Sequence, residues 1–255
     1  MRALYSLWCW TVGVVATLVF GTLAILTSWV PPRGRVYLFW ARAWARVVIA
    51  GCGFPVRIEV DPEARRTSAA ILMANHESVL DIFVLLAAVP QDVRFLAKRS
   101  LFQIPVLGWS MWLGGFIPVD RDRADSAREV FETLEKKLAE GVSVLIFPEG
   151  TRSRDGELLP FKKSGFLLAL RTGAPIVPVG ISGAHASLGR GAFALTRCPI
   201  HVRVGRPVPT EGLGVSRRAA LMEEVRAAIL AARSGRPARA DDRPEAEDRS
   251  GTGGR

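Results

Sequence analysis

The chain of 255 residues suits one globular domain with short appendages, because domains usually span about 100–200 residues. Its hydrophobic content of 49% is high for a soluble domain, and its formal net charge of +10 favours an anionic partner, either nucleic acid or an anionic membrane surface. Three scattered cysteines in no metal-ligand spacing argue against a disulfide framework and against a zinc site, so a reducing environment is expected.

The first part of the chain, residues 1–52, is expected to anchor it to a membrane. The run from Leu7 to Val30 carries no charged side chain and would be about 36 Å long as a helix, enough to cross a hydrocarbon core of about 30 Å. Tryptophans lie near both of its ends, and Pro31-Pro32 stops it. Most nearby arginines follow the run, which predicts a cytoplasmic location for the rest of the chain whether this helix crosses or re-enters the membrane.

A second helix, predicted over Val36–Ala50, places Arg35, Arg42 and Arg46 on one face and apolar and aromatic side chains on the opposite face. This pattern is typical of a helix that lies in the headgroup layer with its arginines near lipid phosphates. An ordinary domain helix with a solvated basic face is the alternative.

Residues 53–233 alternate short apolar or β-branched runs with helical patterns, which predicts an α/β domain with a mixed, mostly parallel sheet of about seven strands covered by helices. Residues 234–255 are rich in Gly, Pro and balanced charge, and are expected to be a disordered tail. The predicted strands are 56–60, 70–74, 94–97, 115–119, 142–147, 176–181 and 200–204, and the predicted helices are 79–88, 126–140, 164–172 and 216–232.

Chemically active side chains follow four of the predicted strands directly. They are His76, Arg121, the run Glu149–Arg152, and Ser182. Ligands of open α/β sheets bind outside the carboxyl ends of the strands. If these strands run parallel, the four pieces converge on one edge of the sheet.

His76 and Asp81 are the first candidate catalytic pair. Two residues that are five positions apart cannot lie on the same face of a helix. A strand-to-helix turn can nevertheless bring the carboxylate back to the imidazole and fix its tautomer. Such an imidazole could take a proton from a hydroxyl. The alternative is that Asp81 only caps the helix that follows Ser78.

Other candidate groups support weaker interpretations. The run Glu149–Arg154 could be a simple turn, or its guanidinium groups and backbone amides could bind a phosphate; it is not a Walker loop. The neighbourhood of Ser182 nearly matches the elbow of serine hydrolases, but Ala184 occupies its last glycine position. His185 and His201 could also act as bases, although no acidic residue lies close in sequence to orient His185.

Four motifs in order resemble the glycerolipid acyltransferase superfamily, and most closely the bacterial 1-acylglycerol-3-phosphate acyltransferases. The resemblance covers residues 70–183, with a mild departure at Ser100 and Phe102. The motifs are Asn75 to Asp81, Lys98 with Ile104-Pro105 and Gly108-Trp109, Phe147 to Ser153, and Ile176 to Val179.

The resemblance implies transfer of an acyl group from a thioester to the sn-2 hydroxyl of lysophosphatidic acid. In this scheme His76 is the base and Asp81 orients it. The resemblance also assigns phosphate binding to Lys98, Arg121 and Arg152, and the shape of the glycerol site to Glu149, Gly150 and Thr151.

This interpretation needs no cofactor and no metal, and uses acyl-CoA or acyl-acyl carrier protein as the co-substrate. The expected partners are membrane lipids and lysophosphatidic acid rather than nucleic acid, and the expected location is the inner (cytoplasmic) membrane with the catalytic domain on its cytoplasmic side. Two alternatives remain open: an acyltransferase for another acceptor, such as a lyso-ornithine lipid or another lysophospholipid, and a non-catalytic protein that binds anionic lipids.

Overall fold

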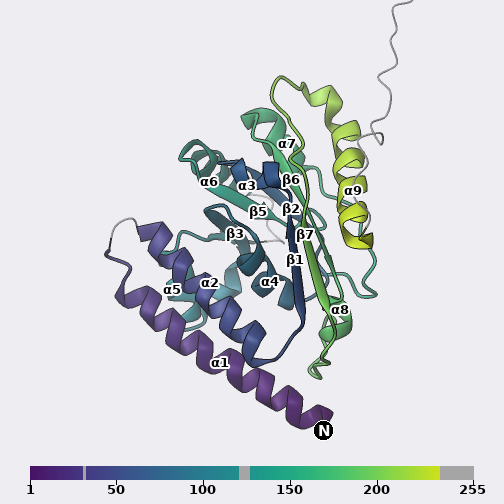
Figure 1. The fold of residues 1–255 in the computed structure, drawn as a ribbon. Helices are drawn as coiled ribbons and strands as arrows, with labels where there is room; N and C mark the ends of the chain where they lie inside the picture. Colours follow the sequence, from purple (N-terminus) through teal and green to yellow (C-terminus); the bar gives the residue numbers. More distant parts are fainter. Residues whose placement is uncertain (31–32, 121–126, 236–255) are drawn as a thin grey trace, which may run out of the picture.

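The computed structural model describes residues 1–30, 33–120 and 127–235, and its described part is built on a seven-stranded sheet (Figure 1). The strand order is β1-β7-β6-β2-β5-β3-β4; β6, β2, β5, β3 and β4 run parallel, and β7 is antiparallel to β6. The predicted mixed, mostly parallel sheet is confirmed. The strands are β1 (Val56–Val60), β2 (Ile71–Ala74), β3 (Val93–Lys98), β4 (Ile117–Val119), β5 (Ser143–Ile146), β6 (Ile176–Ser182) and β7 (Ile200–Val204).

Helices cover both faces of the sheet, and alternate residues of the central strand β2 serve the two layers. Ile71 and Met73 pack in one core with residues of α6, α7 and α9, whereas Leu72 and Ala74 pack in the other core with residues of α2 and α4. A strand buried on both faces is apolar along its whole length, as β2 is. The helices of these layers are α4 (Leu80–Ala88), α6 (Ala127–Ala139), α7 (Ser164–Thr172) and α9 (Arg218–Ser234).

The two N-terminal helices, α1 (Arg2–Leu26) and α2 (Arg33–Gly51), lie side by side at one flank of the molecule (Figure 1). By length and composition, α1 could cross a membrane, and only 22% of its most apolar window is buried. It ends at Leu26, before the predicted limit at Val30. Helix α2 packs against both α1 and α4, so it joins the apolar N-terminal helix to the sheet layer.

The structure corrects the predicted surroundings of one arginine of α2. Arg42 is half-buried, and its Nη2 donates to the carbonyl oxygens of Val89, Pro90 and Gln91 at 2.8, 3.0 and 2.8 Å. These carbonyls follow the last turn of α4, where a cation is favoured by the helix dipole. Arg42 therefore binds the protein and does not lie among lipid phosphates, whereas Arg35 and Arg46 are exposed as predicted.

Several short elements were missed because they lack a periodic apolar pattern long enough to recognise. The first residue of the predicted helix 126–140 and residues 236–255 of the predicted tail lie outside the described residues. Helix α9 continues to Ser234. The missed elements are α3 (Pro62–Arg66), η1 (Arg99–Gln103), α5 (Leu107–Leu113), α8 (Ala184–Ser187) and η2 (Val215–Arg217).

Gly180 of β6 allows α9 to approach the sheet closely. A Cβ atom there would lie 2.5 Å from the Arg233 nitrogen and 2.6 Å from the carbonyl carbon of Ala232, and neither backbone atom can move alone. We expect Gly180→Ala to lower the free energy of unfolding by about 1–3 kcal/mol, as overpacking does. Gly214→Ala is the matched control, because a Cβ atom on Gly214 would have one neighbour within 4 Å, the Ser216 Oγ at 3.7 Å. Thermal unfolding in detergent tests this, and equal Tm values for the two variants would contradict it.

Candidate active site

The carboxyl ends of neighbouring parallel strands bring the candidate residues to one edge of the sheet. The loop of His76 leaves β2, which lies between β5 and β6; the loop of Glu149 leaves β5, and Ser182 ends β6. Lys98 ends β3, the next strand beyond β5. The predicted convergence is therefore confirmed for His76, Glu149 and Ser182, and Lys98 lies at the same edge. Arg121 lies outside the described residues.

His76 and Asp81 are in direct contact at the turn between β2 and α4. The His76 Nδ1 and the Asp81 Oδ2 are 2.8 Å apart, and the same oxygen accepts the backbone N–H groups of Glu77 and Ser78 at 2.7 and 2.9 Å. Asp81 is fully buried and His76 is 8% exposed. Orientation of the imidazole and capping of the turn, which were alternatives in the sequence, are thus performed by one oxygen. With Nδ1 donating its proton to Asp81, Nε2 keeps a lone pair and can act as a base.

The ring of His76 is also fixed by an aromatic neighbour. It stacks on Phe147 with ring centroids 3.9 Å apart and an interplanar angle of 15°. Phe147 begins one of the four motifs, but the sequence alone gives it no role. This contact holds the imidazole from its face while Asp81 holds it at its edge.

Glu149 joins the β5 loop to the β2 loop. Its Oε1 accepts the His76 backbone N–H at 2.7 Å, and its Oε2 accepts the Leu159 N–H at 2.8 Å. The Ser153 N–H donates to the His76 carbonyl at 2.8 Å, so the two loops are joined in both directions. Burial raises the pKa of Glu149, and the two amide hydrogen bonds oppose that rise. Both carboxylate oxygens are engaged by the backbone, which makes Glu149 a positioning residue for the His76 loop.

The residues after Glu149 form a turn whose last side chains face outward. Gly150 has a φ of +70°, and a Cβ there would lie 2.6 Å from the Lys162 Cε, so glycine is needed. Thr151 and Arg152 are partly exposed, and the Arg152 carbonyl accepts a hydrogen bond from Arg190 at 3.0 Å. Within the described part of the chain, the Arg152 guanidinium has no hydrogen-bond or ion-pair partner, so it is available to bind an anion.

The sequence did not reveal a second network, which lies behind the turn of His76 and Asp81. Asn75 exchanges two hydrogen bonds with the backbone of Ile181 and donates a third to the Glu77 Oε1 at 3.0 Å. Arg233, in the last turn of α9, donates to the same Glu77 oxygen at 2.8 Å and to the Gly156 carbonyl at 2.6 Å. No motif marks Arg233, which is 156 positions from Glu77, so only the fold could reveal this pair.

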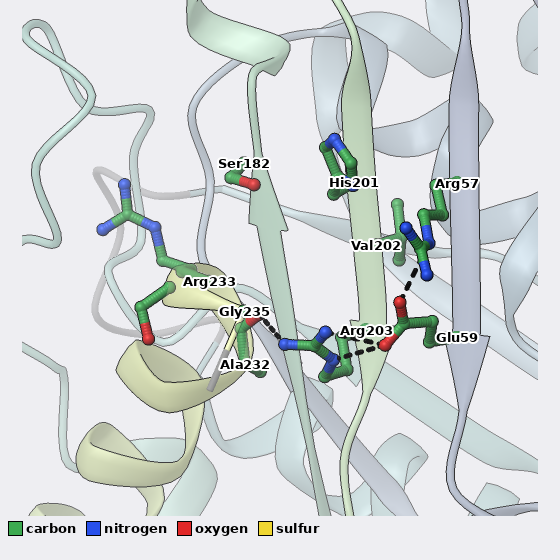
Figure 2. A pocket seen from close by; sticks show the side chains of 10 residues that line it. Arg57, Glu59, Ser182, His201, Val202, Arg203, Ala232, Arg233 and Gly235 are labelled. Atoms are coloured by element: carbon green, nitrogen blue, oxygen red, sulfur yellow. Dashed lines mark hydrogen bonds and ion pairs between the residues drawn. The ribbon is translucent and has the colours of Figure 1, made fainter. Parts of the chain in front are cut away.

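The other two histidines do not form a comparable pair. The His185 backbone N–H donates to Glu77. The His185 Nδ1 is buried and has no hydrogen-bond partner within the described residues. His201 is exposed on β7, opposite Ser182 in the antiparallel register. Figure 2 shows His201 in a hollow between β1, β7 and the end of α9, where Arg57 and Arg203 both bind Glu59. The hydrogen bond from Arg203 is the main cause of the lowered pKa of Glu59.

Comparisons with known proteins support the interpretation of these motifs. The profile of the acyltransferase family matches residues 56–182. Human 1-acyl-sn-glycerol-3-phosphate acyltransferase beta is 32% identical over 232 residues, which cover 87% of this chain and 78% of that protein. A second relative is the chloroplastic 1-acyl-sn-glycerol-3-phosphate acyltransferase BAT2 of Brassica napus, which is 37% identical over 181 residues. This match covers 69% of this chain and about half (51%) of the length of BAT2.

A solved structure shows that the likeness extends to the fold. The crystal structure of the 1-acyl-sn-glycerophosphate (LPA) acyltransferase PlsC from Thermotoga maritima matches with a TM-score of 0.78 and 25% identity. The match covers 90% of this chain and 95% of that one. The predicted α/β fold with preceding N-terminal helices is thus shared with an experimental structure.

The pKa of Glu77 leads to a prediction for stability. Burial raises it from 4.5 to about 7, while Arg233 and the His185 N–H act in the opposite direction. Between these values the folded state holds a proton that the unfolded state has lost, so the contribution of Glu77 to stability falls as the pH rises through this window. Glu77→Gln removes this dependence. We therefore expect the Tm of the variant minus the Tm of wild type to be higher at about pH 7.5 than at about pH 5.

Thermal unfolding in detergent at the two pH values measures this difference. Glu157→Gln, at an exposed position, is the control for the loss of one negative charge. A Tm difference that moves in favour of wild type as the pH rises would contradict the prediction.

Proposed function

Because this chain belongs to the glycerolipid acyltransferase family, we propose that it is a membrane-bound 1-acylglycerol-3-phosphate O-acyltransferase. It transfers an acyl group from an acyl thioester to the sn-2 hydroxyl of lysophosphatidic acid, and the product is phosphatidic acid. The observation that carries the proposal is the buried His76–Asp81 pair, 2.8 Å apart, at the edge of the sheet where the loop of Arg152 also lies.

His76 acts as a general base in the proposed reaction. Its Nε2 takes the proton of the acceptor hydroxyl while the hydroxyl oxygen forms a bond to the thioester carbonyl carbon. The carbon–sulfur bond then breaks, and the imidazolium returns the proton to the departing thiolate. Asp81 stabilises the positive ring through the hydrogen bond to Nδ1. A thioester is already activated, so the transfer requires no covalent enzyme intermediate and no cofactor or metal.

The acceptor phosphate is bound by cations at the same edge of the sheet. Arg152 has a partly exposed side chain, and Lys98 is exposed at the end of β3. Arg121 shares this role by the family resemblance. Glu149, Gly150 and Thr151 form the turn that shapes the glycerol site, since the turn carries Arg152 and is tied to the His76 loop. A guanidinium suits this task because it can donate two parallel hydrogen bonds to a phosphate.

The enzyme works at the inner (cytoplasmic) membrane with the catalytic domain in the cytoplasm. The apolar helix α1 supports membrane association, and the arginines that follow it support the cytoplasmic side. The lysolipid is delivered by the membrane, whereas acyl-CoA or acyl-acyl carrier protein arrives from the cytoplasm. Both donors are anionic, and the formal net charge of +10 favours their approach.

Removal of the base tests the mechanism. We expect His76→Ala to lower the turnover of lysophosphatidic acid and acyl thioester by about 10²–10⁴-fold, the usual contribution of a general base. The variant should still unfold cooperatively, at a lower Tm because the buried Asp81 loses one of its donors. His201→Ala removes an exposed histidine and should keep its activity. Turnover by the His76 variant close to that of the His201 variant would exclude His76 as the base.

Phosphate recognition is tested separately by Arg152→Ala. A hydrogen bond to a charged group contributes about 1.5–3 kcal/mol, so the KM for lysophosphatidic acid should rise by about 10–150-fold. Arg154→Ala, an exposed arginine two positions further on, is the matched control. Equal KM values for the two variants would show that Arg152 does not bind the phosphate.

The same variants distinguish the acceptor. If a lyso-ornithine lipid, which has no phosphate, is used better than lysophosphatidic acid, the phosphate-binding roles of Lys98, Arg121 and Arg152 fail together. Another lysophospholipid used better would keep those roles and change the substrate. Lipid binding without turnover of any acceptor would indicate a non-catalytic lipid-binding protein.

A further inference from the structure

The segment that follows β3 carries an exposed apolar face. Residues 100–119 contain no charged side chain. The outward side chains of α5 are Trp109, Trp112 and Leu113, which are 59%, 72% and 39% exposed, while Ser110 is buried. A helix on the surface of a soluble domain has the opposite pattern, with polar residues outward. An exposed aromatic surface of this kind indicates an interaction site.

This apolar face adjoins the N-terminal helix that could cross a membrane. Helix α5 packs against α1, and a Cβ on Gly21 would lie 2.7 Å from the Val106 Cγ1. Val106 has a φ of +65°, a strained conformation for a β-branched residue. At the other end of α5, a Cβ on Gly114 would lie 2.5 Å from the ring of Tyr37 in α2. The two N-terminal helices therefore hold α5 in place at both ends (Figure 1).

Positive side chains border the apolar face on the side of the sheet. Lys98 and Arg99 are exposed and immediately precede the uncharged segment. Ile104, in the loop between η1 and α5, is 43% exposed and extends the apolar surface. Apolar and tryptophan side chains next to cations match the two layers of a bilayer surface, because tryptophan favours the interface and lysine and arginine bind lipid phosphates.

We propose that α5 and the preceding loop insert into the same leaflet of the bilayer that α1 enters. Trp109, Trp112 and Leu113 lie at the boundary with the acyl chains, and Lys98 and Arg99 lie at the level of the phosphates. The protein thus contacts the membrane through a segment of its catalytic domain as well as through α1. If the proposed function holds, this contact places Lys98, a candidate phosphate ligand, where a lysolipid leaves the bilayer.

Spin labels on the full chain test the insertion directly. Cys9, Cys52 and Cys198 are replaced by alanine, and single cysteines are introduced by Trp112→Cys and Trp109→Cys for labelling. The labelled protein is reconstituted into vesicles of phosphatidylethanolamine and phosphatidylglycerol. Collisions with oxygen, which concentrates in the bilayer, are compared with collisions with a water-soluble nickel chelate. Both labels should collide more with oxygen than with the chelate.

Two exposed valines calibrate the measurement. Val19 of α1 is 49% exposed and serves as the bilayer reference, whereas Val215 of η2 is 56% exposed and serves as the water reference. Labels at 109 and 112 that resemble the label at 215 would overturn the proposal, as would labels shielded from both reagents, which would indicate a protein contact. The experiment measures no acyl transfer, so its failure is distinguishable from failure of the proposed function.

Discussion

The arrangement of the site depends on one buried carboxylate. Asp81 sits in the first turn of α4, and its Oδ2 accepts hydrogen bonds from the imidazole of His76 and from two backbone amides. A buried carboxylate is costly without donors; the imidazole and two amides at the N-terminal end of α4 supply three to Oδ2, while Oδ1 is buried without a partner among the described residues. Asp81 therefore binds two amides of the turn between β2 and α4 and, with the His76 Nδ1 as donor, leaves Nε2 free.

The strand order explains how other loops reach this turn. Because β2 lies between β5 and β6, the loop of His76 has a neighbour on each side. Glu149 secures it to the β5 loop by accepting the His76 N–H, the Ser153 N–H donates to the His76 carbonyl, and Asn75 secures it to the end of β6. Arg233 adds a contact from α9 through Glu77. His76, the proposed base, is thus held by elements that are separated by most of the domain in sequence, which favours a rigid turn.

The sequence was sufficient for the features that follow from local pattern. Apolar runs predicted every strand to within two residues at each end, and their parallel order predicted the convergence of His76 and Glu149. Contacts made by long side chains across the fold could not be predicted, because no spacing rule connects Arg42 to the end of α4 or Arg233 to Glu77. Helix α5 was missed because it has only seven residues and its apolar side chains are divided between the core (Met111) and the surface (Trp109, Trp112, Leu113), so no apolar period marks it.

Helix α4 links the membrane side of the protein to the proposed chemistry. It is only nine residues long, and such a short helix is marginal without support at its ends. Asp81 complements the dipole at its first turn, and Arg42 of α2 complements it at the carbonyls beyond its last turn. The helix that carries Asp81, the proposed partner of the base, is thus stabilised from the other end by a helix that packs on the apolar α1. Helix α4 therefore contacts the anchoring helices near its end and carries Asp81 in its first turn.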